Sequence, residues 1–106
     1  MAKEATVEIW IGLAHVAAGA RTSFLSEYEG AYVNALALSR NREEFLSQVT
    51  SALEEDLEVV LAGVDDIEPL RVRSLRGEVD LEIRKVVDTL TPDHPVDFDD
   101  FQFYVD

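Results

Sequence analysis

Residues 32–64 read YVNALALSRNREEFLSQVTSALEEDLEVVLAGV, and the fold can be worked out from this stretch. An apolar run from Ala31 to Leu38 leads into a charged segment with helical periodicity, and a second apolar run extends from Leu57 to Val64. Short apolar runs of this kind are typical of buried strands. The stretch therefore predicts a strand, a helix and a second strand, with the two strands parallel or nearly so and joined by a right-handed crossover.

The predicted helix has a marked start and one apolar face. Asn41 is a residue type that caps free amide groups at a helix start, and Glu44 completes the spacing of a capping box. Apolar side chains recur at spacings of three and four, which places them on one face. These are Phe45, Leu46, Val49, Ala52, Leu53 and Leu57. The far end carries Glu54, Glu55 and Asp56, where the helix dipole favours cations instead.

The residues on either side predict further elements. Alternation over 7–16 predicts a first strand, with Trp10 on the side opposite the main apolar row. Apolar residues at helical spacing over 78–90 predict a second helix, which could begin as early as Pro69 with an interruption near Gly77. The aromatic tail predicts a closing edge strand over 101–105.

Two connecting segments are predicted between these elements. Residues 17–30, AAGARTSFLSEYEG, are small and polar, which predicts a long loop with one helical turn around 24–28. A loop of this length is often functional or mobile, and its aromatic pair could instead fold it back onto the core. The segment 65–70, DDIEPL, predicts an acidic turn with Pro69 as a boundary.

Together these elements predict an α+β two-layer sandwich in the order β-β-α-β-α-β. It would have about four mostly antiparallel strands with both helices on one face, related to the split βαβ arrangement. The 106 residues and their 47% apolar content fit one domain spanning 1–106.

Charge and composition limit the partners. The net charge of −13 would repel nucleic-acid phosphates and anionic membranes and would attract a basic partner. The absence of cysteine excludes disulfides and thiolate zinc sites and agrees with a cytoplasmic protein. The first 20 residues make a poor signal peptide, and no stretch has the length of a transmembrane helix. We therefore expect a cytoplasmic protein that binds neither nucleic acid nor a membrane.

Residues that could carry chemistry are few. His15 and His94 both occupy positions typical of structural or solvated histidines. Asp97, Asp99 and Asp100 could hold a hard cation, but they lack the glycine and distal glutamate of a calcium loop. No known catalytic or nucleotide-binding pattern is present. We expect no cofactor and no metal, and an enzyme is unsupported by these residues.

The strongest charge asymmetry lies between Glu43 and Leu70, which contain nine acidic residues and no basic one. The arginines that follow, Arg71, Arg73 and Arg76, are expected to pair with neighbouring carboxylates. We expect a noncatalytic protein-interaction domain whose acidic face engages a basic partner. This predicted face comprises Glu54, Glu55, Asp56, Glu58, Asp65, Asp66 and Glu68.

Two alternatives remain open. The first is a small-molecule-binding or minor enzymatic domain that uses a cleft beside the 17–30 loop, lined by Trp10, His15, Arg21 and Tyr28. The second is a homodimer built on an exposed strand edge, in which the acidity serves only solubility.

Residues 30–70, GAYVNALALSRNREEFLSQVTSALEEDLEVVLAGVDDIEPL, resemble a segment of small uncharacterised bacterial α+β domains. In those domains an apolar strand, an acid-capped helix and an exit resembling V-x-x-x-E-P-L recur. In size and acidity the chain is also similar to immunity proteins of bacterial toxin systems, which mask basic toxin surfaces. That similarity implies a partner-masking role and carries no catalytic residue.

Overall fold

A computed structural model describes residues 6–17, 30–56 and 59–104, and the fold is given for these residues. The elements in chain order are β1 (Glu8–Ala17), β2 (Gly30–Ser39), α1 (Arg42–Ser51), the π-helical turn η1 (Ala52–Asp56), β3 (Val60–Pro69), α2 (Leu70–Leu75), α3 (Leu81–Val87), β4 (Val96–Phe98) and β5 (Gln102–Tyr104). The predicted α+β class is confirmed. The predicted order is corrected to include a further short helix and a further short strand.

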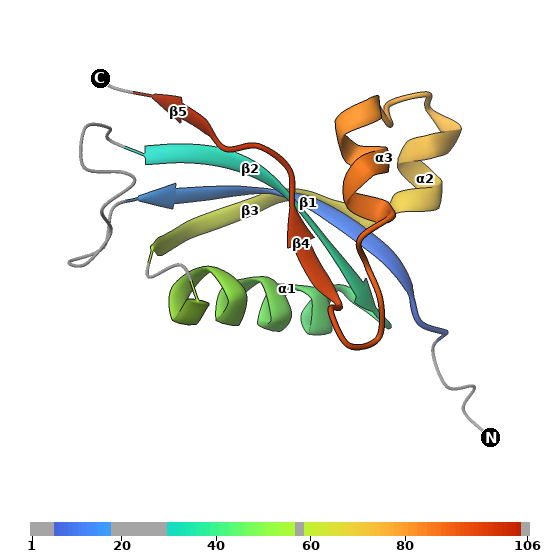
Figure 1. The fold of residues 1–106 in the computed structure, drawn as a ribbon, viewed down its shortest axis with the longest axis horizontal. Coiled ribbons are helices and arrows are strands. Elements are labelled where there is room, and N and C mark those ends of the chain that lie inside the picture. Colours follow the sequence, from blue (N-terminus) through green and yellow to red (C-terminus); the bar gives the residue numbers. More distant parts are fainter. Residues whose placement is uncertain (1–5, 18–29, 57–58, 105–106) are drawn as a thin grey trace.

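β1 lies in the middle of an antiparallel sheet (Figure 1). It pairs antiparallel with β2 on one side and with β3 on the other, so β2 and β3 run in the same direction. β4 and β5 both pair with the outer edge of β2. The predicted strand-helix-strand unit is therefore β2, α1 and β3, with the first strand of the chain inserted between its two strands.

The helices cover opposite faces of the sheet, which corrects the prediction that they share one face (Figure 1). The core beneath α1 includes Ala14, Val16, Ala35, Phe45, Val49 and Leu53. A smaller core beneath α3 consists of Ile11, Leu36, Ile83 and Val86. Successive residues of a strand point to opposite faces, and β1 is apolar on both, so each face needs its own helical cover. Trp10 lies opposite the Ile9 and Ile11 row as predicted, and it packs against the larger core.

Several boundaries differ from those predicted. β3 continues through 65–69, where an acidic turn was expected, because an outer strand tolerates carboxylates that point to solvent. The segment 70–87 forms two helices, α2 and α3, which agrees with the predicted alternative of an early start near Pro69 and an interruption near Gly77. Gly77 has a φ of 72°, the left-handed conformation that favours glycine. The aromatic tail forms β5 at 102–104, but a further strand, β4, precedes it. The predicted helical turn at 24–28 lies outside the described residues.

The start of α1 follows the predicted cap in part. The Asn41 side chain accepts a hydrogen bond from the Glu44 backbone N–H at 2.8 Å. The Glu44 carboxylate reaches back to the N–H of Arg40, at 3.2 Å, and not to that of Asn41 as a capping box requires. Arg40 also donates from Nε to this carboxylate at 2.9 Å, which draws it one residue further back.

No helix in the described ranges combines the length and the apolar character needed to span a membrane.

Candidate functional site

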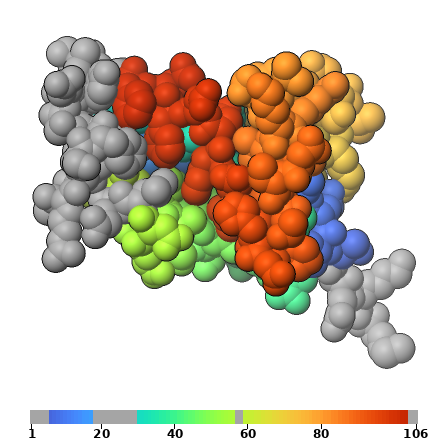
Figure 2. Space-filling model, in the orientation of Figure 1, coloured from blue at the N-terminus to red at the C-terminus, as the bar shows by residue number. Residues whose placement is uncertain are grey.

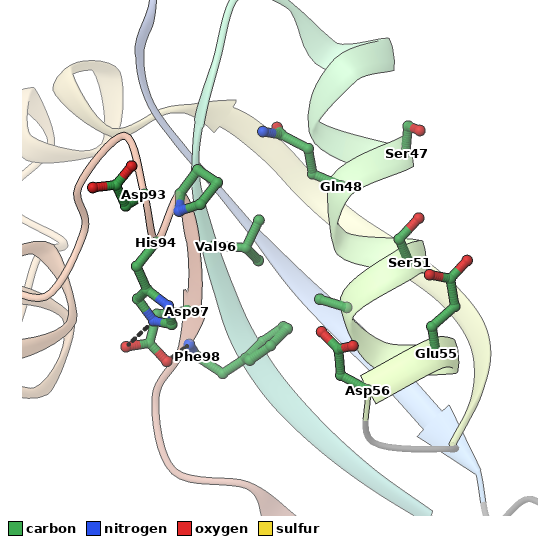
Figure 3. Close-up of a pocket in the computed structure, with 12 residues that line it drawn as sticks. Ser47, Gln48, Ser51, Glu55, Asp56, Asp93, His94, Val96, Asp97 and Phe98 are labelled. Atoms are coloured by element: carbon green, nitrogen blue, oxygen red, sulfur yellow. Dashed lines mark hydrogen bonds and ion pairs between the residues drawn. The ribbon is translucent and has the colours of Figure 1, made fainter.

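A groove of about 550 Å³ separates α1 and η1 from the segment 93–98 (Figure 3). Its lining comes from two parts of the chain about 40 residues apart, Ser47–Asp56 and Asp93–Phe98. The side chains of Val96 and Phe98 point from β4 toward the helix, and Ala52 lies on the opposite wall. The groove therefore has an apolar interior between two polar rims.

Carboxylates stand on both rims of this groove. Glu55 and Asp56 belong to η1, and Asp93 and Asp97 belong to the opposite segment. Among the described residues that line the groove there is no lysine or arginine. The one imidazole is that of His94, whose Nε2 lies 3.5 Å from Asp97 Oδ2. Four acidic residues thus line the groove without an arginine or lysine of the described lining to balance them, although the Asp97 carboxylate is turned toward Thr89 and His94.

Asp97 is held in its ionised form. Burial would raise the pKa of its carboxyl, but the hydrogen bond from Thr89 Oγ1, at 2.6 Å, together with that from the Phe98 backbone N–H, at 2.8 Å, outweighs this effect. The pKa of Asp97 therefore lies below its ordinary value. The negative charge on this rim persists into mildly acidic solution.

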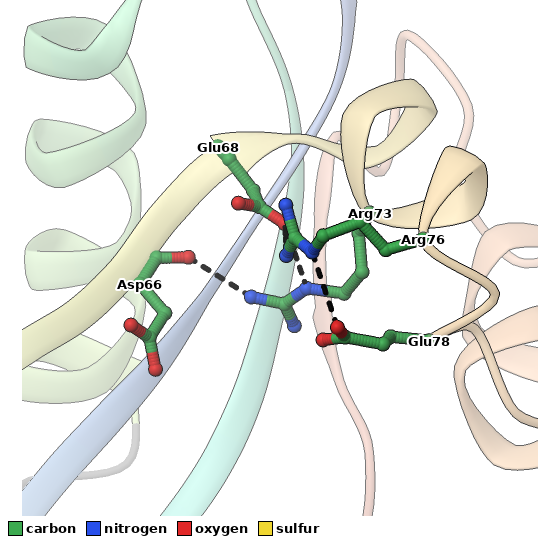
Figure 4. A network of polar contacts seen from close by, with 5 residues as sticks. All are labelled: Asp66, Glu68, Arg73, Arg76 and Glu78. Atoms are coloured by element: carbon green, nitrogen blue, oxygen red, sulfur yellow. Dashed lines mark hydrogen bonds and ion pairs between the residues drawn. The ribbon is translucent and has the colours of Figure 1, made fainter.

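A second pocket, of about 480 Å³, lies on the opposite face of the sheet and contains charges of both signs. Arg73, whose side chain is 10% exposed, lies with Nε 3.1 Å from Glu68 Oε1 (Figure 4). Arg76 donates from Nη2 to the same oxygen and from Nε to Glu78, at 3.1 Å. The Arg76 guanidinium, with a smaller contribution from Arg73, holds the pKa of Glu68 below its ordinary value.

These contacts confirm that the arginines after β3 pair with neighbouring carboxylates. Arg71 completes the set, because its Nε lies 2.8 Å from Glu8 Oε1. The charges of this second pocket are thus largely satisfied within the chain, and the network ties α2 to β3. Its geometry is that of a structural ion-pair network.

The residues of the predicted acidic face do not form one surface. Glu54, Glu55 and Asp56 lie in η1, beside the first groove, and only the last two line it. Asp66 and Glu68 line the pocket on the other face of the sheet. Asp65 is paired in register with Leu13 on that face, and Glu58 lies outside the described residues.

The described members of the predicted cleft point to opposite faces of the sheet. Trp10 packs on the α1 side, whereas His15 pairs in register with Tyr32 and makes an edge-on ring contact with it, with centroids 4.4 Å apart. His15 Nε2 lies 2.9 Å from Asp65 Oδ2 but is not aligned for a hydrogen bond. Trp10 and His15 therefore cannot line one cavity, and Arg21 and Tyr28 lie outside the described residues.

The aspartates of the tail have separate environments. Asp97 faces Thr89, and Asp99 accepts hydrogen bonds from the backbone N–H and the side-chain Nδ2 of Asn34, both at 2.8 Å. In the part of the chain that the structure describes, no three histidine, cysteine or acidic side chains are grouped as metal ligands.

Sequence reasoning did not single out Asp93 or include Asp97 in the acidic face. Both are more than 35 positions from Glu55, and only the pairing of β4 with β2 brings them opposite η1. The available signal was local, namely the acidic segment that begins between Pro92 and Pro95.

No protein-family model, no curated protein and no solved structure matches this chain.

Proposed function

We propose that this chain is a noncatalytic protein-interaction domain that binds a basic segment of a partner protein in the groove between η1 and residues 93–98. The observation that carries the proposal is the set of carboxylates that line this groove without a lysine or arginine beside them. In this proposal the chain acts as an immunity or inhibitor protein does, by masking a basic surface.

The groove suits a lysine or arginine side chain. Such a side chain has an apolar stem and a charged head, so its stem can lie along Val96 and Phe98 while its head reaches the carboxylates at the rim. A guanidinium can also bind a carboxylate through two hydrogen bonds. The acidic residues of β3 are less suitable, because Glu68 is already engaged by two arginines.

The net charge of −13 supports the same function through kinetics. A strongly acidic domain draws a basic partner toward it over a distance set by ionic strength. Charge complementarity of this kind raises the association rate more than it raises affinity. Binding in the groove should therefore weaken, and its association should slow, as salt is added.

The test uses a short arginine-rich peptide as the probe, with a peptide of equal length in which glutamate replaces arginine as the negative control. The groove variant carries Glu55→Gln, Asp56→Asn and Asp93→Asn. The control variant carries Asp66→Asn, Asp88→Asn and Asp100→Asn, which are exposed carboxylates outside the groove and change the net charge equally. Affinity is measured by calorimetry, and the site by amide chemical-shift changes.

We expect the groove variant to bind the arginine-rich peptide on the order of tenfold more weakly than the parent, because three rim charges are lost. The control variant should lose much less affinity. Chemical-shift changes should centre on residues 51–56 and 93–98. Equal losses in the two variants, or shift changes spread over the whole acidic surface, would show that the groove is not a specific site.

A further inference from the structure

A small apolar groove of about 330 Å³ lies between the start of β1 and α2. It is separate from the groove between η1 and residues 93–98, which is called the acidic groove below. Its lining consists of Glu8, Ile9, Leu70, Arg71 and Ser74. Figure 2 shows the start of β1, in blue, directly beside the hairpin of α2 and α3, in yellow and orange. None of these residues lines the acidic groove.

Two exposed apolar residues are next to lining residues of this groove along the chain. Leu75, which follows the lining residue Ser74, is 86% exposed, and Val7, which precedes Glu8, is 53% exposed. Leu75 is also one helical turn after Arg71, so the two lie on the same side of α2. An apolar groove with an exposed leucine on the same helix is typical of an interaction surface.

The charges at this groove are balanced, unlike those of the chain as a whole. Its only charged lining residues in the described chain are Glu8 and Arg71, which pair at 2.8 Å. The whole chain carries −13, so two copies repel one another at most orientations. They can approach with little repulsion at a surface that is locally neutral.

We propose that this groove is the surface through which two copies of the chain associate about a two-fold axis. A two-fold interface brings the same surface together twice, so each contact must complement itself. A cation and an anion side by side meet that requirement, because Arg71 of each copy can face Glu8 of the other. Leu75 of each copy then covers the apolar groove of the other.

The outer edge of β3 is a poorer place for a second copy. Its pairing with β1 is irregular between Ile11 and Leu13 and again between His15 and Val16. Bulges of this kind, together with the exposed carboxylates of Asp65 and Asp66, blunt a strand edge against pairing with another chain. These observations favour a dimer through α2 over the predicted strand-edge dimer.

Sedimentation equilibrium over a range of protein concentrations and salt concentrations tests the proposal. The dimer should tighten as salt is raised, because salt screens the repulsion between two acidic chains. This is the opposite salt dependence to that of peptide binding in the acidic groove, so either proposal can fail without the other. A chain that stays monomeric at every salt and protein concentration would overturn the dimer.

Four variants locate the interface. Leu75→Asp should weaken the dimer by on the order of tenfold or more, while its thermal unfolding stays close to that of the parent because the side chain is already exposed. Val60→Asp, at an exposed position of β3, is the matched control and should leave dimerisation unchanged. Loss of the dimer in the Val60 variant, or its persistence in the Leu75 variant, would contradict an interface at α2. Arg71→Glu should also weaken the dimer, and adding Glu8→Arg should restore it.

Discussion

Arg73 donates a hydrogen bond from Nη2 to the backbone carbonyl oxygen of Asp66 at 2.9 Å, and Asp66 has a φ of 54°. The residue lies where the pairing of β3 with β1 is irregular, since Ile11 pairs with Glu68 but Leu13 pairs with Asp65. One extra residue in β3 is accommodated there, and its carbonyl group is satisfied by the helix that follows. The bulge in β3 and the buried Arg73 thus form one connection, which holds the end of β3 against α2.

Replacing Arg73 should weaken this connection between β3 and α2 and lower the stability of the fold. Arg73→Lys keeps the charge but cannot contact Glu68 and the Asp66 carbonyl with the same planar group, so we expect a loss of about 1–2 kcal/mol in the free energy of unfolding. Arg73→Ala should lose more, about 2–3 kcal/mol, because it leaves the Asp66 carbonyl oxygen without this donor and leaves Glu68 with Arg76 as its remaining partner. The control is Arg84→Lys at an exposed position of α3, with an effect near zero. Urea unfolding gives all three values, and equal stability of the two lysine variants would contradict the role of Arg73.

The left-handed conformation of Asp66 predicts a characteristic order of substitutions. Asp66→Asn should be nearly neutral, since asparagine adopts this conformation readily, whereas Asp66→Val should cost about 1–2 kcal/mol because of its branched Cβ. Asp66→Gly removes the steric cost and should be at least as stable as the valine variant. Thermal unfolding of the three proteins checks the order. A valine variant as stable as the asparagine variant would argue against a positive φ at this position.

Gly12 is required because the core beneath α1 leaves no space for a side chain. A Cβ at this position would lie 2.8 Å from Val64 Cγ1 and 3.0 Å from Phe45 Cε2. Gly12→Ala should therefore destabilise the fold by about 1–3 kcal/mol through overpacking. Gly63→Ala is the matched control in β3, because a Cβ there meets no atom within 4 Å, and it should be neutral or slightly stabilising. Denaturant unfolding of the pair measures both effects, and a Gly12 variant as stable as the Gly63 variant would contradict the packing.

Asp99 gives a pH dependence of defined sign. Burial raises the pKa of Asp99 above its ordinary value of 3.8, and the hydrogen bonds from Asn34 offset this only in part. The Asp99 carboxyl group therefore binds its proton more tightly in the folded chain than in the unfolded chain. Protonated Asp99 contributes stability that is complete below pH 3.8 and is lost as pH rises through its folded-state pKa. Asp99→Asn carries no such proton. The free energy of unfolding of the parent minus that of the variant should therefore fall as pH rises across this window.

Unfolding in urea at a series of pH values measures that difference. Asp97 and Glu68 titrate with the opposite sign, because their lowered pKa values contribute stability that is lost as pH falls. Both are present in the parent and in the variant, so their effects cancel in the comparison. Asp88→Asn, at an exposed position whose charge does not contribute to the pKa of Asp99, is the control. A difference between parent and Asp99 variant that is independent of pH would contradict the raised pKa.

The central part of the fold could be predicted because its signals are local. Phe45, Val49 and Leu53 are buried as their spacing predicts, and Asn41 caps α1. The face on which each helix packs could not be predicted, because β1 is apolar on both sides and its alternation does not say which row meets which helix. The strand character of 65–69 was also missed, since two adjacent aspartates resemble a turn unless the bulge that accommodates them is known.

The sequence identified the acidic residues of only one rim of the acidic groove. Glu55 and Asp56 were identified from local charge, whereas Asp93 and Asp97 become their neighbours only when β4 pairs with β2. Charge patterning along a chain identifies which residues are acidic, but it does not place residues far apart in the sequence. The division of the predicted acidic face between the two sides of the sheet has the same cause.

The position of β1 also constrains how the chain can be made. Ala14 pairs with Val64, about fifty positions later, so the sheet cannot acquire both neighbours of its central strand until β3 has left the ribosome. Before then, the β1 and β2 hairpin presents an unpaired edge and two apolar surfaces, and the second surface stays bare until α3 is synthesised. A nascent chain that pauses between β2 and β3 should therefore be prone to aggregate. A chain that pauses after α3 already has a helix over each face of the β1 and β2 hairpin and should be less prone to do so.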